Sequence, residues 1–542
     1  MARDLKADQA LLREIVAHTD RRDFPRAAAL AEQALASGFE HPLLLNVIAT
    51  RREQEGRLEE ARGLLERAVR IAPGDVGARN ALSLCLQRLD RPAEALGHVD
   101  ELLKMHPDLS FAHANRGNAL IALGLLGQAK QSHLRALELE PGNLAAVAAL
   151  ASIATHRGEH EEARGRAEQA LAMVPGLPDA IMSLAAAELA AGATARAETL
   201  LWQLLADPRA GATDKARASG LLGDVLDAAG RYREAFDAYT TCNDQLKQIY
   251  RRYGNGRGVL AYACSLTEAM RAAGPGPWAA ASAAAVSGGA VGHVFMVGFP
   301  RSGTTLTEVV LDGHPDVASI EEHELLIDAV LRFMGEPLDL SALIRAEESE
   351  LEALRAAYWA RVRSAGFDVV GKVFVDKYPL NTLKLPLIAR LFPRAKVLFA
   401  CRDPRDVVLG CFRRRFKMNP AMYELLSLTG GAALYEAVMG FAELARPVLG
   451  LDWHVVRYES LVADLGAETG AICEFLGIKP VAGMADFAQR VRQREHSTPS
   501  TAQLARGLDR SGIGHWRHYA ANLAPVLPTL QPWVERFGYP AS

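Results

Sequence analysis

A repeat of 34 residues in the first half of the chain constrains its fold more than any other feature. Three independent registers share this step: Pro73, Pro107, Pro141 and Pro175; Gly56, Asp90, Gly124, Gly158 and Gly192; and Ala27, Ala61, Ala95, Ala129, Ala163 and Ala197. Each unit contains two short helices with apolar faces. The Gly or Asp separates them, the small Ala lets the second pack closely on the first, and the Pro stops the second helix. An all-α array is therefore predicted.

The period and the small-residue positions resemble a tetratricopeptide array covering residues 9–250. The resemblance implies a right-handed superhelix whose concave groove commonly holds a peptide or a partner protein. Asn46 and Asn80 share a register and are candidates for that groove, or are ordinary surface residues. A dimerisation or spacer role is the alternative for the whole array, which leaves a homodimer open.

Length and composition exclude several classes of protein. A chain of 542 residues is too long for one hydrophobic core, so at least two domains are expected. The net charge of -3 predicts no attraction to nucleic acid or membrane for the whole molecule. Residues 1–12 lack the apolar core of a signal peptide, and no apolar run is long enough to cross a bilayer. The six scattered cysteines favour neither disulfides nor zinc and fit a reducing, cytoplasmic compartment.

A second domain is expected at 291–542, after a helical and Ala/Gly-rich linker at 251–290. It opens with the apolar strand pattern 293–299, which precedes the glycine-bearing loop 300–305 and a helical pattern at 306–312. A strand, a loop and a helix in this order aim backbone N–H groups and a helix N-terminus at an anion. This segment therefore predicts an anion-binding loop.

The loop departs from that of nucleotide triphosphatases, G-x-x-x-x-G-K-[ST]. Gly298 and Gly303 have the required spacing and Thr305 fits the last position, but Thr304 replaces the lysine. A triphosphate enzyme needs that lysine against the outer phosphates. Its absence, together with Arg301 inside the loop, favours a donor with fewer phosphates. A phosphotransferase or nucleotide hydrolase on the same loop is the alternative.

Residues 299–305 resemble the 5′-phosphosulfate loop of sulfotransferases, which use 3′-phosphoadenosine 5′-phosphosulfate as donor. The resemblance extends through 311–315 to Glu321 and Glu322, where the chain is most similar to the tyrosylprotein sulfotransferase branch. It implies that the donor's 5′ end is held by Arg301, Ser302, Gly303, Thr304 and Thr305, with Arg301 also acting in catalysis.

In that branch the second Glu of the pair is the catalytic base, and Glu322 occupies its place. The acceptor hydroxyl must lose its proton as it attacks sulfur, and a nearby carboxylate can take it. His323 is a second candidate, because the base is a histidine in the cytosolic small-molecule branch. The alternative for the two Glu residues is a solvated helix start, at the beginning of a helix-like segment over 321–333.

Two further catalytic residues are implied by the resemblance. Lys377 follows the strand pattern 373–376 and matches a lysine that stabilises charge on the oxygen linking sulfate to phosphate. A surface lysine at a strand end is the alternative. Ser500 takes the place of a catalytic-site serine in a segment that reaches Trp516, and Ser497 is a second match that requires a gap.

The strand pattern 396–401, followed by Arg402 and a predicted helix reaching Lys417, resembles the family's 3′-phosphate motif. Arg402 and Arg414 match its two cations. Gly410 stands where the family usually has a serine, and the dense cluster 413–415 is expected to compensate.

One further site residue and one further departure from the family pattern follow in the last part of the chain. Tyr458 matches a tyrosine that packs near the adenine, or is a core aromatic residue at a strand end. His515 falls where the family has a lysine.

The predicted architecture is α + α/β: a repeat superhelix followed by a three-layer α/β domain with a mostly parallel sheet. The predicted reaction moves a sulfuryl group to an acceptor hydroxyl, most readily a protein or peptide tyrosine presented by the repeat groove. Sulfation of a glycan or a small molecule, or a repeat scaffold with a non-catalytic nucleotide-binding domain, are the alternatives. No metal is expected, because cations and amides can neutralise the charge.

Overall fold

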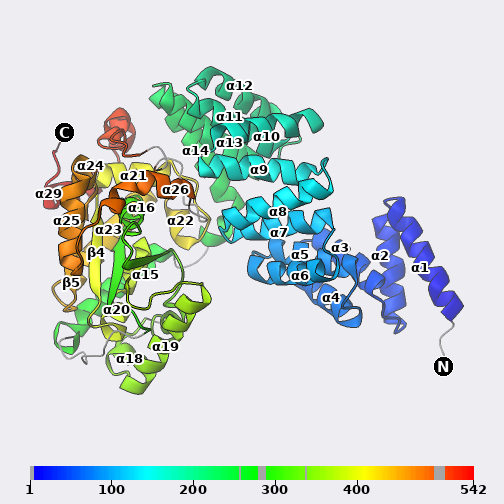
Figure 1. Cartoon of the computed structure of the whole chain (residues 1–542), viewed down its shortest axis with the longest axis horizontal. Coiled ribbons are helices and arrows are strands. Elements are labelled where there is room, and N and C mark those ends of the chain that lie inside the picture. Colours follow the sequence, from blue (N-terminus) through cyan, green and yellow to red (C-terminus); the bar gives the residue numbers. More distant parts are fainter. Residues whose placement is uncertain are drawn as a thin grey trace. The chain divides into compact units, whose positions relative to one another are not determined.

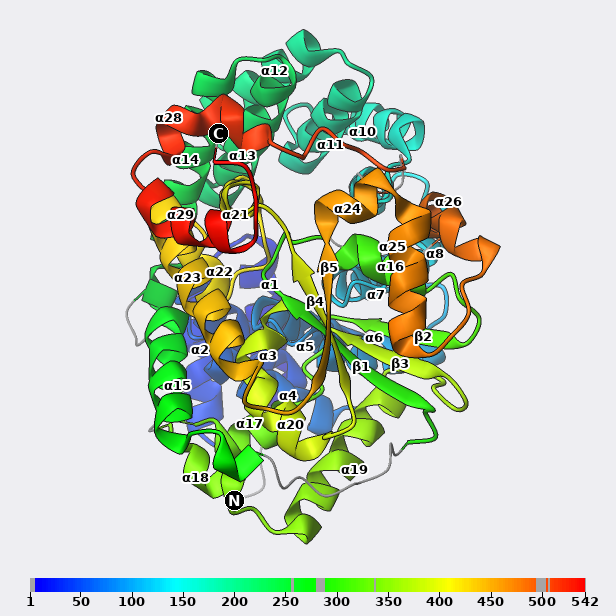
Figure 2. The ribbon, with the colours of Figure 1, turned by 90° about the vertical axis from the view of Figure 1, so that its left-hand side faces the viewer.

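The computed structural model describes residues 5–254, 258–278, 288–335, 338–493, 504 and 507–541 (Figures 1 and 2). These residues form two compact units that meet in sequence between Ser183 and Leu184, inside helix α11 (Pro178–Ala190). Among the described helices, none combines the length and the apolarity needed to cross a membrane.

The first unit is a series of helices that pack against their neighbours in sequence. The helices are α1 (Leu5–Asp20), α2 (Phe24–Ala36), α3 (Pro42–Gln54), α4 (Leu58–Ile71), α5 (Val76–Arg88), α6 (Pro92–Met105), α7 (Ser110–Ala122), α8 (Leu126–Leu139), α9 (Leu144–Arg157) and α10 (His160–Met173).

The predicted repeat register is confirmed by backbone geometry. The residue between the helices of each pair has a positive φ: 76° at Gly56, 57° at Asp90, 79° at Gly124 and 72° at Gly158. Glycine adopts this conformation without steric penalty, and aspartate tolerates it better than most residues. The repeating alanines, from Ala27 to Ala197, are fully buried, so the helices approach closely at these positions.

Helices α12 (Thr194–Ala206), α13 (Ala212–Ala228) and α14 (Tyr232–Ile249) lie in the second unit together with the sheet. The boundary of the compact units therefore differs from the one expected near Tyr250. Contacts of α14 with the sheet domain explain the difference: the Asn243 side chain donates a hydrogen bond to the Phe412 carbonyl at 2.9 Å, and the Phe236 and Phe412 rings stack.

Helix α15 (Val259–Ala273) falls in the segment expected to be a linker. It packs against α23 (Leu428–Ala445) and buries Ala263, Leu266 and Met270 in the largest hydrophobic core. This stretch therefore contributes to the sheet domain. Residues 279–287, the Ala/Gly-rich part, lie outside the described residues.

The described strands form one parallel sheet in the order β2-β3-β1-β4-β5. They are β1 (Gly292–Gly298), β2 (Val317–Glu321), β3 (Val373–Lys377), β4 (Lys396–Cys401) and β5 (Asp452–Arg457). Because every described pair is parallel, the carboxyl ends of the strands meet at one edge. That edge is where ligands bind in open α/β sheets.

Helices cover both faces of the sheet, which confirms the predicted three-layer fold (Figure 2). Phe295 and Val297 point into one core, and Val294 and Met296 point into the other. The remaining helices are α16 (Thr304–Leu311), α17 (Ile327–Phe333), α18 (Leu340–Ile344), α19 (Glu348–Ser364), α20 (Leu385–Leu391), α21 (Pro404–Phe412), α22 (Pro420–Glu424), α24 (Tyr458–Ala463), α25 (Leu465–Leu476), α26 (Phe487–Gln493), α28 (Ala520–Leu523) and α29 (Leu527–Arg536), with the short 3-10 helices η3 (Pro379–Lys384) and η5 (His515–Tyr519) among them.

Two predicted helix boundaries are wrong. Glu321 ends strand β2, where it pairs in register with Lys377, and the next helix begins at Ile327. Helix α21 ends at Phe412 and does not reach Lys417. In both places, contacts distant in sequence override a local pattern of helix-forming residues.

Candidate active site

Both glycines of the predicted anion loop are required by their surroundings. A Cβ atom on Gly298 would lie 2.6 Å from the Ala400 carbonyl oxygen of the neighbouring strand, at a φ of 148°. Gly303, with a φ of 96°, caps helix α16, and a Cβ there would lie 2.7 Å from the ring of Tyr458. The loop therefore runs tightly between β4 and Tyr458 before the helix starts.

Arg301 has a φ of 70°, unusual for a residue with a side chain. Burial, and then the neighbouring guanidinium groups of Arg414 and Arg402, lower the pKa of Arg301 to about 9. Cations gathered in this way repel one another, and an anion between them would remove the repulsion. The arrangement therefore indicates an anion site.

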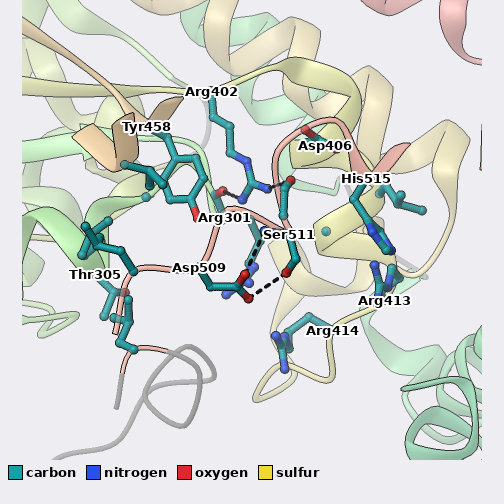
Figure 3. A pocket seen from close by; sticks show the side chains of 18 of the residues that line it. Arg301, Thr305, Arg402, Asp406, Arg413, Arg414, Tyr458, Asp509, Ser511 and His515 are labelled. Carbon is teal, nitrogen blue, oxygen red and sulfur yellow. Dashed lines mark hydrogen bonds between the residues drawn. The ribbon is translucent and has the colours of Figure 1, made fainter. Parts of the chain in front are cut away.

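Arg402 follows the end of β4 and is held in place by backbone groups (Figure 3). It donates hydrogen bonds to the carbonyls of Arg301, at 3.2 Å, and Gly512, at 2.5 Å. Its guanidinium lies over the ring of Tyr458, 4.4 Å from the ring centroid. The tyrosine therefore orients a cation as well as forming part of the site wall.

These groups border a cavity of about 210 Å³. Most of the predicted donor-binding residues line it, namely Arg301, Gly303, Thr304, Thr305, Arg402, Gly410, Arg414 and Tyr458. Ser302 is buried and does not line the cavity. The structure thus brings together residues from three separate segments of the sequence.

Lys377 lies in a second cluster and is fully buried, not on the surface. Its Nζ is 2.6 Å from Glu321 Oε1, 3.0 Å from Glu322 Oε1 and 3.7 Å from Glu308 Oε2. Burial by itself would lower the pKa of Lys377, but Glu321, Glu308 and Glu322 raise it above its ordinary value. The lysine is therefore held in its charged form.

Glu322 has a strained backbone, with a φ of 51°. Its N–H donates a 2.7 Å hydrogen bond to the Lys377 carbonyl, and its side chain is 50% exposed. Among the described residues of the second unit, Arg301 and Glu322 are the two non-glycine residues with positive φ. Such a conformation costs about 1–2 kcal/mol and tends to be retained at functional sites.

The lysine cluster does not line the cavity but lies at the same carboxyl edge of the sheet. Lys377 pairs in register with Met296 of β1, two residues before Gly298. Glu308 lies on α16, one turn after Thr304 of the anion loop. Helix α16 therefore connects the cavity to the lysine cluster. Ser500 and Ser497 lie outside the described residues.

Comparisons with known proteins agree with this geometry. Residues 293–482 match the model of the sulfotransferase family, and residues 12–76 and 53–117 match models of the tetratricopeptide repeat. The sheet domain is therefore similar to the sulfotransferase family. The repeats that precede it are tetratricopeptide repeats, as predicted.

Several relatives share parts of the chain. An uncharacterized protein of Aquifex aeolicus is 25% identical over 78% of this chain and 54% of its own length. A putative protein-tyrosine sulfotransferase of Caenorhabditis briggsae is 30% identical over 22% of this chain and 43% of its own. Protein-tyrosine sulfotransferase 1 of Mus musculus is 32% identical over 22% of this chain and 34% of its own length. The chain thus spans about half the length of these relatives, or less.

Solved structures that resemble part of the chain include tetratricopeptide repeat proteins. The match to a tetratricopeptide repeat protein from Parabacteroides merdae covers 44% of this chain and 92% of that protein, with a TM-score of 0.36 and 19% identity. The match to a tetratricopeptide protein of Thermus thermophilus covers 33% of this chain and 98% of that protein, with a TM-score of 0.30 and 21% identity.

The cavity of the sulfotransferase domain also contains residues that the sequence did not single out. Asp224 and Asp227 reach it from α13, and Asp406 reaches it from α21. Arg413, a member of the predicted arginine cluster, also lines it. Asp406 accepts hydrogen bonds from the N–H groups of Gly514, at 2.7 Å, and Trp516, at 2.9 Å. No local motif marks these aspartates, because their partners are distant in sequence.

His515 also lines the cavity, and its Nε2 lies 2.9 Å from Asp227 Oδ1. The residue that stands where the family has a lysine is therefore paired with a carboxylate of α13.

Proposed function

We propose that this protein is a sulfotransferase that moves a sulfuryl group from 3′-phosphoadenosine 5′-phosphosulfate to an acceptor hydroxyl. The observation that carries the proposal is the convergence of Arg301, Arg402 and Arg414 on one cavity at the N-terminus of α16. Guanidinium groups and helix N-termini both stabilise bound phosphate and sulfate groups. Among the described residues, no hydrogen bond or ion pair engages the side chain of Arg414.

In this proposal the donor is held at both ends. Arg301 and the loop residues Ser302 to Thr305 bind the 5′-phosphosulfate, and Arg402 and Arg414 bind the 3′-phosphate. Tyr458, which lies against Gly303 and beneath Arg402, packs near the adenine. The donor supplies an activated sulfuryl group, and the residues of the chain bind it and exclude water.

The transfer requires a base and a stabiliser of the leaving group. The acceptor oxygen forms a bond to sulfur as the bond between sulfur and the 5′-phosphate oxygen breaks. Glu322, half-exposed and therefore accessible to an acceptor, takes the hydroxyl proton. Lys377, with Ser500, stabilises the negative charge that the leaving phosphate gains. The carboxylates around Lys377 keep it charged for this role.

We further propose a tyrosine on a protein or peptide as the acceptor. The similarity to protein-tyrosine sulfotransferases and the presence of tetratricopeptide repeats support this choice. In this view the repeats hold the acceptor protein while the sulfotransferase domain acts on it.

Two measurements test the proposal. Calorimetry with adenosine 3′,5′-bisphosphate and with ATP should show tighter binding of the bisphosphate. Labelled donor should then transfer sulfate to a tyrosine peptide more efficiently than to a glycan or a small phenol. Equal or tighter binding of ATP would refute the donor. Transfer to the glycan or phenol in place of the peptide would refute the acceptor, and binding without any transfer would indicate a non-catalytic scaffold.

Arg301→Ala should weaken binding of adenosine 3′,5′-bisphosphate roughly tenfold or more, because a charge-assisted contact is worth roughly 1.5–3 kcal/mol. Calorimetry on the purified variant measures the change. Arg345→Ala, at an exposed arginine after α18, is the matched control and should bind as the wild type does. Wild-type affinity in Arg301→Ala would exclude this arginine from the donor site.

Gly410→Ser should tighten binding of the bisphosphate about two- to tenfold, the effect of one hydrogen bond of ~0.5–1.5 kcal/mol. A Cβ at this position would lie 3.6 Å from Arg301 Cβ, an ordinary contact, so the cavity can accept the side chain. Gly410→Ala introduces the same Cβ without the hydroxyl and is the control in calorimetry. A serine variant that binds no more tightly than the alanine variant would show that the hydroxyl does not reach the ligand.

A further inference from the structure

The last helix pair before the sheet, α13 and α14, contributes carboxylates to the cavity of the sulfotransferase domain. Asp227 of α13 is contacted by three side chains from other segments: Arg413 Nη2 at 2.7 Å, His515 Nε2 at 2.9 Å and Tyr519 Oη at 2.5 Å. Figure 3 shows Arg413 and His515 side by side at the cavity. Asp227 thus joins the segment after α21 to the 3-10 helix η5.

Asp224, one turn earlier on α13, makes a second connection. It accepts hydrogen bonds from Arg415 Nη2, at 2.5 Å, and from the Tyr239 hydroxyl, at 3.0 Å. The helix surface is shaped for this arginine, because a Cβ on Gly220 would lie 2.5 Å from Arg415 Cδ. Asn243 of α14 holds the Phe412 carbonyl at the start of the same segment.

These contacts distinguish the three consecutive arginines by whether a carboxylate pairs with them. Arg413 and Arg415 are paired with Asp227 and Asp224, respectively. Arg414 lies between them and lines the cavity, and no described residue forms a hydrogen bond or an ion pair with its side chain. The two aspartates therefore fix the backbone on both sides of the arginine that remains available to a ligand.

We propose that Asp227 and Asp224 are positioning residues of the nucleotide site, so that the last helix pair of the repeat array is a structural part of that site. The aspartates act through Arg413 and Arg415, which set the position of Arg414 between them. Asp227 also holds His515, which lines the cavity. This inference rests on the proposed function, because it assumes that the ligand of Arg414 is the 3′-phosphate of the donor.

The direction in which phosphate affinity changes when Asp227 is neutralised distinguishes a positioning residue from one that only lines the cavity. A carboxylate beside an anion site opposes anion binding by electrostatic repulsion. If the aspartate only lined the cavity, its neutralisation would therefore tighten binding of a phosphate. If it positions the arginines, its neutralisation weakens binding, because Arg413 loses its partner and the segment loses its anchor.

The test uses the full-length chain with the substitution Asp227→Asn, which preserves size and removes the charge. Calorimetry compares adenosine 3′,5′-bisphosphate with AMP, which lacks the 3′-phosphate. We expect the variant to bind the bisphosphate about tenfold more weakly and AMP with little change. Asp237→Asn is the matched control, because Asp237 is exposed on α14 and should bind both nucleotides as the wild type does.

Each outcome decides a different question. Wild-type protein that binds the bisphosphate no more tightly than AMP would overturn the proposed 3′-phosphate site itself. Wild-type preference for the bisphosphate with equal or tighter binding in Asp227→Asn would overturn the positioning role and leave the proposed function intact. If Asp227→Asn does not fold, Tyr519→Phe decides, because it removes one hydroxyl from Asp227. It should weaken bisphosphate binding more than AMP binding, and an unchanged ratio would overturn the inference.

Discussion

Glu322→Gln should lower turnover by ~10²–10⁴-fold while leaving nucleotide affinity almost unchanged. Glutamine retains the size of the side chain and its hydrogen bond to Lys377 but cannot accept the proton of the acceptor hydroxyl. The charged Lys377, with its Nζ 3.0 Å from Glu322 Oε1, fixes the carboxylate in place. A base contributes to the transition state and not to holding the nucleotide, so calorimetry and single-turnover kinetics should separate the two quantities.

Glu324→Gln is the matched control for this experiment. Glu324 is as exposed as Glu322, at 50%, and pairs with Lys384 at 2.6 Å. Its substitution should leave turnover near the wild-type rate. His323 is the competing base, and its Nδ1 lies 2.8 Å from the Glu321 carbonyl. If His323→Ala abolishes turnover while Glu322→Gln retains it, the histidine is the base and the acceptor class shifts to small hydroxyl compounds.

Lys377→Met should lower the free energy of unfolding of the sulfotransferase domain by about 3–5 kcal/mol, the usual cost of removing one partner from a buried ion pair. The substitution leaves Glu308, which is 1% exposed, and Glu321, which is 13% exposed, without their shared cation. Urea unfolding followed by tryptophan fluorescence measures the change, because all six tryptophans, from Trp202 to Trp533, lie in the second unit.

The loss of unfolding free energy in Lys377→Met should change with pH in a defined direction. The pKa of Lys377 is raised in the folded protein, so its stabilising contribution is complete below the unfolded value and is lost only as the pH rises through the folded one. In Lys377→Met the buried carboxylates lose their cation, and burial then favours their neutral, protonated form. The loss of stability should therefore become smaller as the pH is lowered from about 7, because the carboxylates take up protons.

The pair Lys384–Glu324, whose carboxylate is half-exposed, provides the control for stability. Lys384→Met removes the same charge but leaves a half-exposed carboxylate, so it should cost within about 1 kcal/mol. A Lys377→Met variant as stable as this control at pH 7 would show that the cluster of carboxylates does not depend on Lys377.

Much of the fold follows from local sequence. The repeat is visible because each helix pair needs a residue that tolerates a left-handed turn, which Gly56, Asp90 and Gly124 provide at a constant spacing. The anion loop is visible for a similar reason, because the tight passage between β4 and Tyr458 requires Gly298 and Gly303 at fixed positions. Such signals persist in sequence because a left-handed backbone conformation or a close backbone contact restricts which residue types fit.

The tertiary structure decided which charges meet. The sequence singles out Lys377, but it does not show that Glu308, 69 residues earlier on α16, shares its buried site. Likewise α13 falls inside the predicted repeat array at 9–250, but nothing in the sequence indicates that Asp227 pairs with Arg413, 186 residues away. A carboxylate has no required backbone conformation, so its partner is set by packing between distant segments. Only the folded chain shows that α13, at the end of the predicted repeat array, lines the same cavity as Arg301, Arg402 and Arg414.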